Sequence, residues 1–292
     1  MVYYNIALRI ILISTLIALA AFTSTVSAQD SDKPLVVTSI KPLAIVVKSA
    51  FKDRVRVEYL MPEAQSPHDV VLKLSDIRKL SVADLVFWIG PDFEARAAKT
   101  FATVPELKLV TAMNKIDTDQ MISTYKNHEH DHHEHNFDPH IWLSPSLSGQ
   151  LVEALSQRLN IQAHNIFDKS AKKAVENLLV DVKAGNYITH HQAFDYFVDE
   201  FKLQPGLSIR DMLGKQQGAK THYNLRLEGK KLGVSCVFIE PQHGHKDAIS
   251  VAKDLGVPTK SIDILAVTYE SELPTYEAYI YGLAQQFSAC FK

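Results

Sequence analysis

Short apolar, β-branched segments alternate with helical segments along most of this chain, and this alternation restricts the fold more than any other feature. Strand-like runs are expected at residues 35–39, 55–60, 85–88, 107–110, 187–189, 234–239 and 258–264. Helical spacing of apolar residues is found at 41–51, from Ser75 onward, and at 92–100, 192–201, 246–255 and 275–287. Such alternation is typical of mostly parallel sheets flanked by helices, so we expect an α/β protein.

The chain is expected to divide into two lobes at a helical middle segment. Ser144 suits a helix N-cap and Pro145 suits the first helical position, and we interpret residues 144–184 as helical throughout. Residues 117–137 have a biased composition and are expected to form a mobile loop. No sequence repeat relates the two halves. The expected parts are an N-lobe at 29–160, a connecting helix at 161–185 and a C-lobe at 186–292.

The first 28 residues are expected to be a secretory signal peptide. The apolar run from Ile10 to Phe22 is too short to span a bilayer, which requires roughly 20 residues. Small residues at Val26-Ser27-Ala28 then provide a cleavage site after Ala28. We therefore expect a periplasmic protein of residues 29–292, with an uncleaved anchor as the alternative. No cysteine lies at the cleavage site, so a lipid anchor is not expected there.

Charge and cysteine content narrow the possible partners and the compartment. The chain has 31 basic and 33 acidic residues and a net charge of −2, which argues against nucleic acid as a partner. Its two cysteines, Cys236 and Cys290, fit an oxidising compartment. We expect a disulfide that joins the C-terminal helix to its sheet; the alternative is two separate thiols.

Histidines suggest metal chemistry. A run of five alternates with acidic residues, at His128, His130, His132, His133 and His135. Imidazole suits borderline-soft divalent metals such as Zn²⁺, and the acids supply further oxygens. A solvated polar loop is the alternative for this run. We expect it to be an accessory metal-binding loop.

Three further histidines occupy segments next to predicted strands and helices. His68 follows a strand in Ser-Pro-His-Asp, His140 precedes the helix capped by Ser144, and His191 follows a strand and opens a helix. Such loops line the crevice of open α/β sheets. A lone histidine is more often structural or exposed, but three neutral imidazoles meeting there can hold zinc, with one position left for a carboxylate or water.

The flanking residues carry a family resemblance. Ser66-Pro67-His68-Asp69, the segment His140-Ile-Trp-Leu-Ser-Pro, His191-Gln-Ala-Phe-Asp-Tyr-Phe and Cys236-Val-Phe-Ile-Glu-Pro-Gln resemble the substrate-binding proteins of bacterial zinc ABC importers, in the metal-binding lipoprotein and adhesin superfamily. The resemblance implies two lobes bridged by a long helix, Zn²⁺ bound in the cleft between them, and ligands at His68, His140 and His191. It also implies an inner-membrane ABC permease as partner, together with other periplasmic zinc-binding proteins, and we expect a monomer.

The chain departs from the family pattern at several positions. Asp263-Ile-Leu-Ala replaces Asp-Pro-Leu-Gly, so Asp263 is a further candidate ligand in an altered turn. Pro67 stands where some relatives carry a carboxylate, and Glu63 is nearby but not equivalent. The stretch between Ser144 and the His191 strand is shorter than usual by roughly three helical turns.

Other interpretations stay open at this point. His190 competes with His191, although the motif places the ligand at His191. His243 and His245 form either an accessory metal contact or an exposed polar loop, and Glu240 is expected to hold a ligand in place. Manganese binders of the family carry a carboxylate where this chain has His191. A three-histidine zinc hydrolase and a surface adhesin are the remaining alternatives, but no His-Glu-x-x-His helix is predicted.

Overall fold

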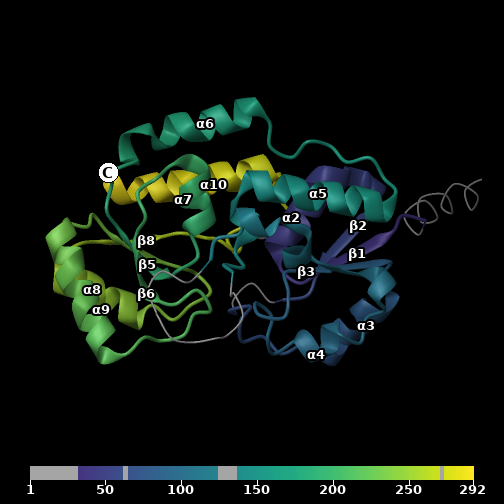
Figure 1. Ribbon diagram of the computed structural model, residues 1–292, viewed down its shortest axis with the longest axis horizontal. Helices are drawn as coiled ribbons and strands as arrows, with labels where there is room; N and C mark the ends of the chain where they lie inside the picture. The colour runs from purple at the N-terminus through teal and green to yellow at the C-terminus, as the bar shows by residue number, and fades with distance from the viewer. Residues whose placement is uncertain (1–31, 62–64, 124–136, 270–272) are drawn as a thin grey trace, which may run out of the picture.

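The structure is a computed structural model that describes residues 32–61, 65–123, 137–269 and 273–292 (Figure 1). The predicted signal peptide, the histidine run and Glu63 lie outside the described residues. The described chain forms two lobes, each a parallel four-stranded sheet with flanking helices, which confirms the predicted fold class. None of the described helices has the length and apolar character needed to cross a membrane.

The N-lobe sheet contains β1 (Leu35–Thr38), β2 (Arg56–Tyr59), β3 (Leu85–Trp88) and β4 (Leu109–Thr111). All pairings are parallel, in the order β2-β1-β3-β4. The central strands β1 and β3 are buried at every position, as expected for strands covered on both faces. The edge strand β2 is only partly buried and accommodates charged side chains.

The C-lobe sheet contains β5 (Ile188–His191), β6 (Leu207–Arg210), β7 (Val237–Ile239) and β8 (Thr259–Ser261). Its order, β6-β5-β7-β8, repeats the N-lobe order strand for strand. The two halves therefore share one topology although no repeat is visible in the sequence. In each sheet the strand order reverses between the two central strands, and ligands bind in the crevice outside the carboxyl ends at such a point.

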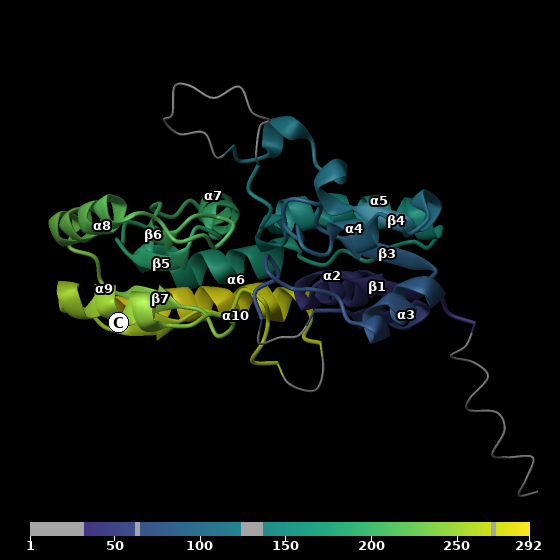
Figure 2. The same cartoon turned by 90° about the horizontal axis from the view of Figure 1, so that it is seen from below.

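Helices cover both sheets, and two of them run between the lobes. The N-lobe has α2 (Lys41–Phe51), α3 (Leu74–Val82), α4 (Ala98–Phe101) and α5 (Pro145–Leu159), and the C-lobe has α7 (Asp195–Phe201), α8 (Ala219–Leu232), α9 (Lys246–Leu255) and α10 (Tyr276–Ser288). Between them, α6 (Lys169–Leu179) packs along α10 (Figure 1). Figure 2 shows α10 extending from the C-lobe to α2 of the N-lobe.

Buried hydrogen bonds and apolar packing tie the lobes together. Trp142 Nε1–H of the N-lobe donates to the Ile264 carbonyl of the C-lobe at 3.1 Å. The Tyr276 hydroxyl at the start of α10 donates to the Trp142 carbonyl at 2.8 Å, and the Tyr276 amide donates to Ser49 Oγ in α2 at 2.8 Å. One buried apolar cluster contains residues of both lobes. These contacts therefore hold the two lobes together.

The predicted disulfide between Cys236 and Cys290 is present. Cys236 directly precedes β7, and Cys290 lies in the 3-10 turn that follows α10. The bond spans a sequence separation of 54 residues and joins the interlobe helix α10 to the centre of the C-lobe sheet. The alternative of two separate thiols is wrong.

The helical middle segment is less continuous than predicted. Asn160 adopts a left-handed conformation (φ 52°) and ends α5, and Asp168 begins α6 by accepting a hydrogen bond from the Ala171 amide at 2.8 Å. Residues 161–168 between these two caps are not helical. Within the range 161–185, the helix itself is α6, followed by a 3-10 turn at Val180–Val182.

Other local differences have identifiable causes. The strand β6 and helix α8 were not predicted. The strand β6 is only partly buried. In α8, Tyr223 and Leu227 are exposed, so the apolar residues do not follow the spacing of a single buried face. The helix after Leu72 begins before Ser75, since the Asp76 carboxylate accepts from the Lys73 amide at 2.7 Å. His191 does not open a helix: it is the last residue of β5.

Candidate metal centre

Three histidines from separate parts of the chain converge between the lobes. His68 lies in the turn after β2, His140 directly precedes the 3-10 helix Ile141–Leu143, and His191 ends β5. One ring nitrogen of each lies within 4.8 Å of those of the other two, and the Nε2 atoms of His140 and His191 are 3.2 Å apart. The structure thus brings together the three histidines identified in the sequence. Their role as metal ligands remains a prediction.

The Nδ1 atom of each of these rings has a hydrogen-bond partner outside the three-histidine group. Nδ1 of His68 lies 3.3 Å from the Phe93 carbonyl. The corresponding atoms of His140 and His191 lie 2.7 Å from Asp138 Oδ1 and 2.6 Å from Glu240 Oε1. A carbonyl or carboxylate oxygen accepts, so Nδ1–H donates and Nε2 keeps its lone pair. Metal-binding histidines are usually oriented by such bonds.

The spacing of the nitrogens suits a small cation. Zinc–nitrogen bonds of about 2.0–2.1 Å in tetrahedral geometry separate two ligand nitrogens by roughly 3.3 Å. The separation of 3.2 Å between Nε2 of His140 and Nε2 of His191 is close to this value. With both Nδ1 atoms donating to carboxylates, these Nε2 atoms present lone pairs to one another, and a shared cation relieves their repulsion.

Burial makes the site deficient in positive charge. It lowers the pKa of His68 and of His140 to about 3, and it lowers the pKa of His191 well below its usual value. Burial also raises the pKa of Asp138 and of Glu240 to about 7. The imidazoles are therefore neutral near pH 7, and a divalent cation supplies the charge that favours ionised carboxylates behind them.

Local packing fixes where the rings point. Asp138 Oδ1 also accepts from the His140 amide at 2.9 Å, so the Asp-Pro-His segment forms a short turn of its own. The Phe93 ring packs edge-on against His68, with centroids 4.7 Å apart, and against Trp142 at 5.3 Å. Gly214 of the C-lobe (φ +72°) also lies near His68, where an added Cβ would be 3.7 Å from its Cδ2.

Asp263 is not brought to this site. It belongs to neither group of potential metal ligands that the described residues form. Its Oδ1 accepts from the Val267 amide at 2.9 Å, and its Oδ2 accepts from the amide and hydroxyl of Thr268 at 2.8 and 2.7 Å. The carboxylate holds the altered turn, in which Ala266 has a positive φ of 56°. The structure therefore does not group Asp263 with the three histidines, and its role as a ligand stays a prediction.

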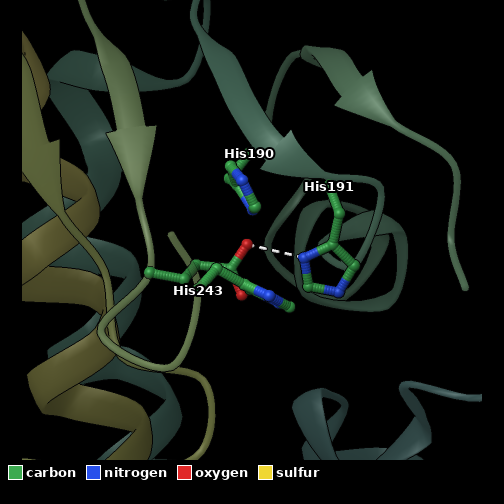
Figure 3. Close-up of side chains that lie close together, drawn as sticks. His190, His191 and His243 are labelled. Carbon is green, nitrogen blue, oxygen red and sulfur yellow. Dashed lines mark hydrogen bonds and ion pairs between the residues drawn. The ribbon is translucent and has the colours of Figure 1, made fainter. Parts of the chain in front are cut away.

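A second group of potential ligands lies in the C-lobe (Figure 3). It comprises His190, His191, Glu240 and His243, again with ligand atoms within 4.8 Å of one another. His190 therefore does not replace His191 among the three interlobe histidines, and His243 is half-buried in a cluster rather than part of an exposed polar loop. His245 belongs to neither group; its Nε2 lies 2.9 Å from the Glu240 carbonyl.

Two partners of the interlobe histidines were not recognised in the sequence. Asp138 lies two residues before His140, so its proximity was a usable signal. The Phe93 carbonyl carries no such signal, because a backbone oxygen is present at every residue. The expected part of Glu240 in holding a ligand matches its contact with His191.

Comparison with known proteins adds independent findings. A family described as zinc-uptake complex component A periplasmic matches residues 36–290. The high-affinity zinc uptake system protein ZnuA of Yersinia pestis is 28% identical over 289 residues, which cover 88% of this chain and 91% of that protein.

Solved structures of the same shape agree. A ZnuA deletion mutant with zinc bound has a TM-score of 0.69 and 20% identity, covering 88% of this chain and 97% of that one. The periplasmic zinc binding protein TroA of Treponema pallidum gives the same TM-score, identity and coverage. At this identity, the two structures are evidence for the fold.

Proposed function

The chain belongs to the family of periplasmic zinc-uptake component A proteins, and from this premise we propose that it captures Zn²⁺ and delivers it to an inner-membrane ABC permease. The observation that carries the proposal is the meeting of His68, His140 and His191, with each Nδ1 hydrogen-bonded to an oxygen outside the group. Zinc is the cargo of such a protein, and its release is part of the function.

The proposed ligands come from both lobes. His68 and His140 belong to the N-lobe, and His191 belongs to the C-lobe. A small change in lobe separation therefore alters the nitrogen spacing and the affinity. Three imidazoles favour zinc over manganese, which prefers oxygen ligands. The fourth position is left to a water molecule or to Glu63, which lies outside the described residues.

The site is suited to binding rather than to hydrolysis. A three-histidine zinc enzyme needs a base that can take a proton from the metal-bound water. The carboxylates nearest the described site, Asp138 and Glu240, are hydrogen-bonded to the Nδ1 atoms of His140 and His191. The family is one of transport components, and we propose that this chain is not an enzyme.

The proposal extends to location and partners. The relatives are periplasmic zinc-uptake proteins, and we infer export by the signal peptide with cleavage after Ala28. The permease and other periplasmic zinc-binding proteins are the proposed partners of a monomer. The histidine run at 128–135 is proposed to collect zinc near the main site.

Zinc titration in competition with a strong chelator tests the main proposal. The full chain is compared with a chain that lacks residues 128–135; the described flanks permit this deletion, because Ser123 and Phe137 pair in an antiparallel bridge. We expect both proteins to keep one tight zinc site. Loss of tight binding on removing the run would exclude the interlobe histidines as the main site.

A further inference from the structure

The second ligand group lies at the point where the strand order of the C-lobe sheet reverses. His190 is in β5, and Glu240 and His243 follow the adjacent strand β7. Figure 3 shows His190 and His243 on one side of His191, and Glu240 belongs to the same ligand group. All are buried except His243, which is half-buried and connects the group to the surface.

One buried ring nitrogen of His190 has no hydrogen-bond partner among the described residues. Its Nε2 lies 3.2 Å from Asp247 Oδ1, and the Asp247 carboxylate is itself held by Arg210, with Nε donating to Oδ2 at 2.8 Å. Since an ionised carboxylate accepts, Nε2–H donates and Nδ1 keeps a lone pair. The His190 side chain is 1% exposed, and among the described residues Nδ1 has no hydrogen-bond partner. A buried acceptor of this kind needs a cation or a donor.

The neighbours of His190 complete a ligand set. The ring centroids of His190 and His243 are 4.7 Å apart. Glu240 accepts from His191 through Oε1 and from Gln242 Nε2 through Oε2 at 2.8 Å, and each carboxylate oxygen has a second lone pair. Two imidazoles and a carboxylate match the preferences of zinc.

We propose that His190, Glu240 and His243 form a second Zn²⁺ site on the C-lobe side of His191. This site lies beyond the proposed function and does not require His191 as a ligand. Because Glu240 contacts both His191 and the second group, the two sites share one carboxylate. Zinc held at the half-buried His243 is thus placed one imidazole ring away from the interlobe histidines.

Zinc stoichiometry of the full chain tests the second site, by equilibrium dialysis against zinc followed by metal analysis. The variants are His243→Gln, His140→Ala and the two combined, and His245→Gln is the matched control from the same loop. We expect each of the first two variants to bind one zinc fewer than the unmodified chain, the combined variant to bind two fewer, and the control to bind the same number. Zinc bound by residues 128–135 is common to all arms and cancels.

Each alternative result has a definite meaning. Unchanged stoichiometry in His243→Gln overturns the second site, and so does a combined variant that binds as much zinc as His140→Ala alone. Unchanged stoichiometry in His140→Ala alone contradicts the interlobe site and leaves the second site standing. His190→Gln is a further variant, since its amide can still donate to Asp247 but has no equivalent of Nδ1; it should also bind one zinc fewer. Circular dichroism confirms that each variant is folded.

Discussion

The two ligand groups differ in how the fold assembles them. The interlobe group needs both lobes, because His68 and His140 come from one and His191 from the other. The C-lobe group of His190, Glu240 and His243 is built on two adjacent strands of a single sheet. The first should respond to changes in lobe packing, whereas the second should respond to changes within the C-lobe. The two kinds of site can therefore be separated by experiment.

Buried carboxylates support the histidines in two different ways. In the C-lobe, Glu240 follows β7 and contacts the His191 ring directly. In the N-lobe, Glu94 is equally buried but acts through the backbone: its carboxylate oxygens accept from the amides of Ile89 and Gly90 at 3.1 and 2.9 Å, in the turn that presents the Phe93 carbonyl to His68. Glu94 thus shapes the site through the backbone, whereas Asp138 of the N-lobe and Glu240 of the C-lobe each contact a histidine ring.

Removing the disulfide should have the largest effect and should act mainly on the C-lobe. The Cys236→Ser, Cys290→Ser double variant loses a cross-link over 54 residues, which the chain-entropy model values at about 4 kcal/mol. Denaturant unfolding measures this loss. Hydrogen exchange should show greater loss of protection in β7 and α10 than in β1 and β3. Equal loss in both sheets would contradict a C-lobe effect.

Replacing His140 should remove the interlobe site without affecting the C-lobe group. Zinc-binding free energies of roughly 10–16 kcal/mol shared by four ligands suggest on the order of 2.5–4 kcal/mol for His140→Ala, or about 60- to 700-fold in affinity. Competition with a chelator measures the change. His164→Gln, at an exposed histidine, is the control and should bind zinc like the unmodified chain. If His140→Ala kept the tight zinc site unaltered, the C-lobe group rather than the interlobe histidines would be the main zinc site.

The buried carboxyl group of Glu94 predicts a pH effect on stability. Burial raises the pKa of Glu94 to about 7 from its usual value near 4.5, so folding favours the protonated form. The resulting stability is present at low pH and is lost as pH rises through about 7. Relative to Glu94→Gln, the zinc-free protein should therefore lose about 3 kcal/mol of unfolding free energy between pH 4.5 and pH 8.

Urea unfolding of both proteins across this pH range measures the difference. The glutamine offers only one acceptor oxygen to the amides of Ile89 and Gly90, which adds an offset that does not depend on pH. The change with pH is therefore the diagnostic quantity. A difference that stays constant from pH 4.5 to 8 would show that Glu94 does not titrate in this range.

The sequence predicted the parts of this molecule that depend on local pattern. Both sheets and the histidines at 68, 140 and 191 follow from strand-to-loop transitions and from a family resemblance. The sequence was a poor guide where a residue acts through geometry. Asp263 was predicted as a further ligand, but the structure does not group it with the three histidines, and its carboxylate accepts from Val267 and Thr268. Residues 161–168 were predicted to be helical, but α5 ends at its C-cap Asn160 and α6 begins only after its N-cap Asp168.

Asp138 offers the most specific remaining test, because it supports the interlobe group and not the C-lobe group. Its Oδ1 holds the His140 ring and amide, and it belongs to neither ligand group. An Asp138→Asn variant keeps the shape but loses the charge that strengthens zinc binding, so affinity at the tight site should fall roughly 10–100-fold with no change in zinc stoichiometry. Glu240→Gln is the matched comparison: it weakens the support of His191 and also removes a ligand of the C-lobe group, so it should lower affinity and stoichiometry together. If Asp138→Asn also lost a zinc ion, the two groups would be one coupled site rather than two.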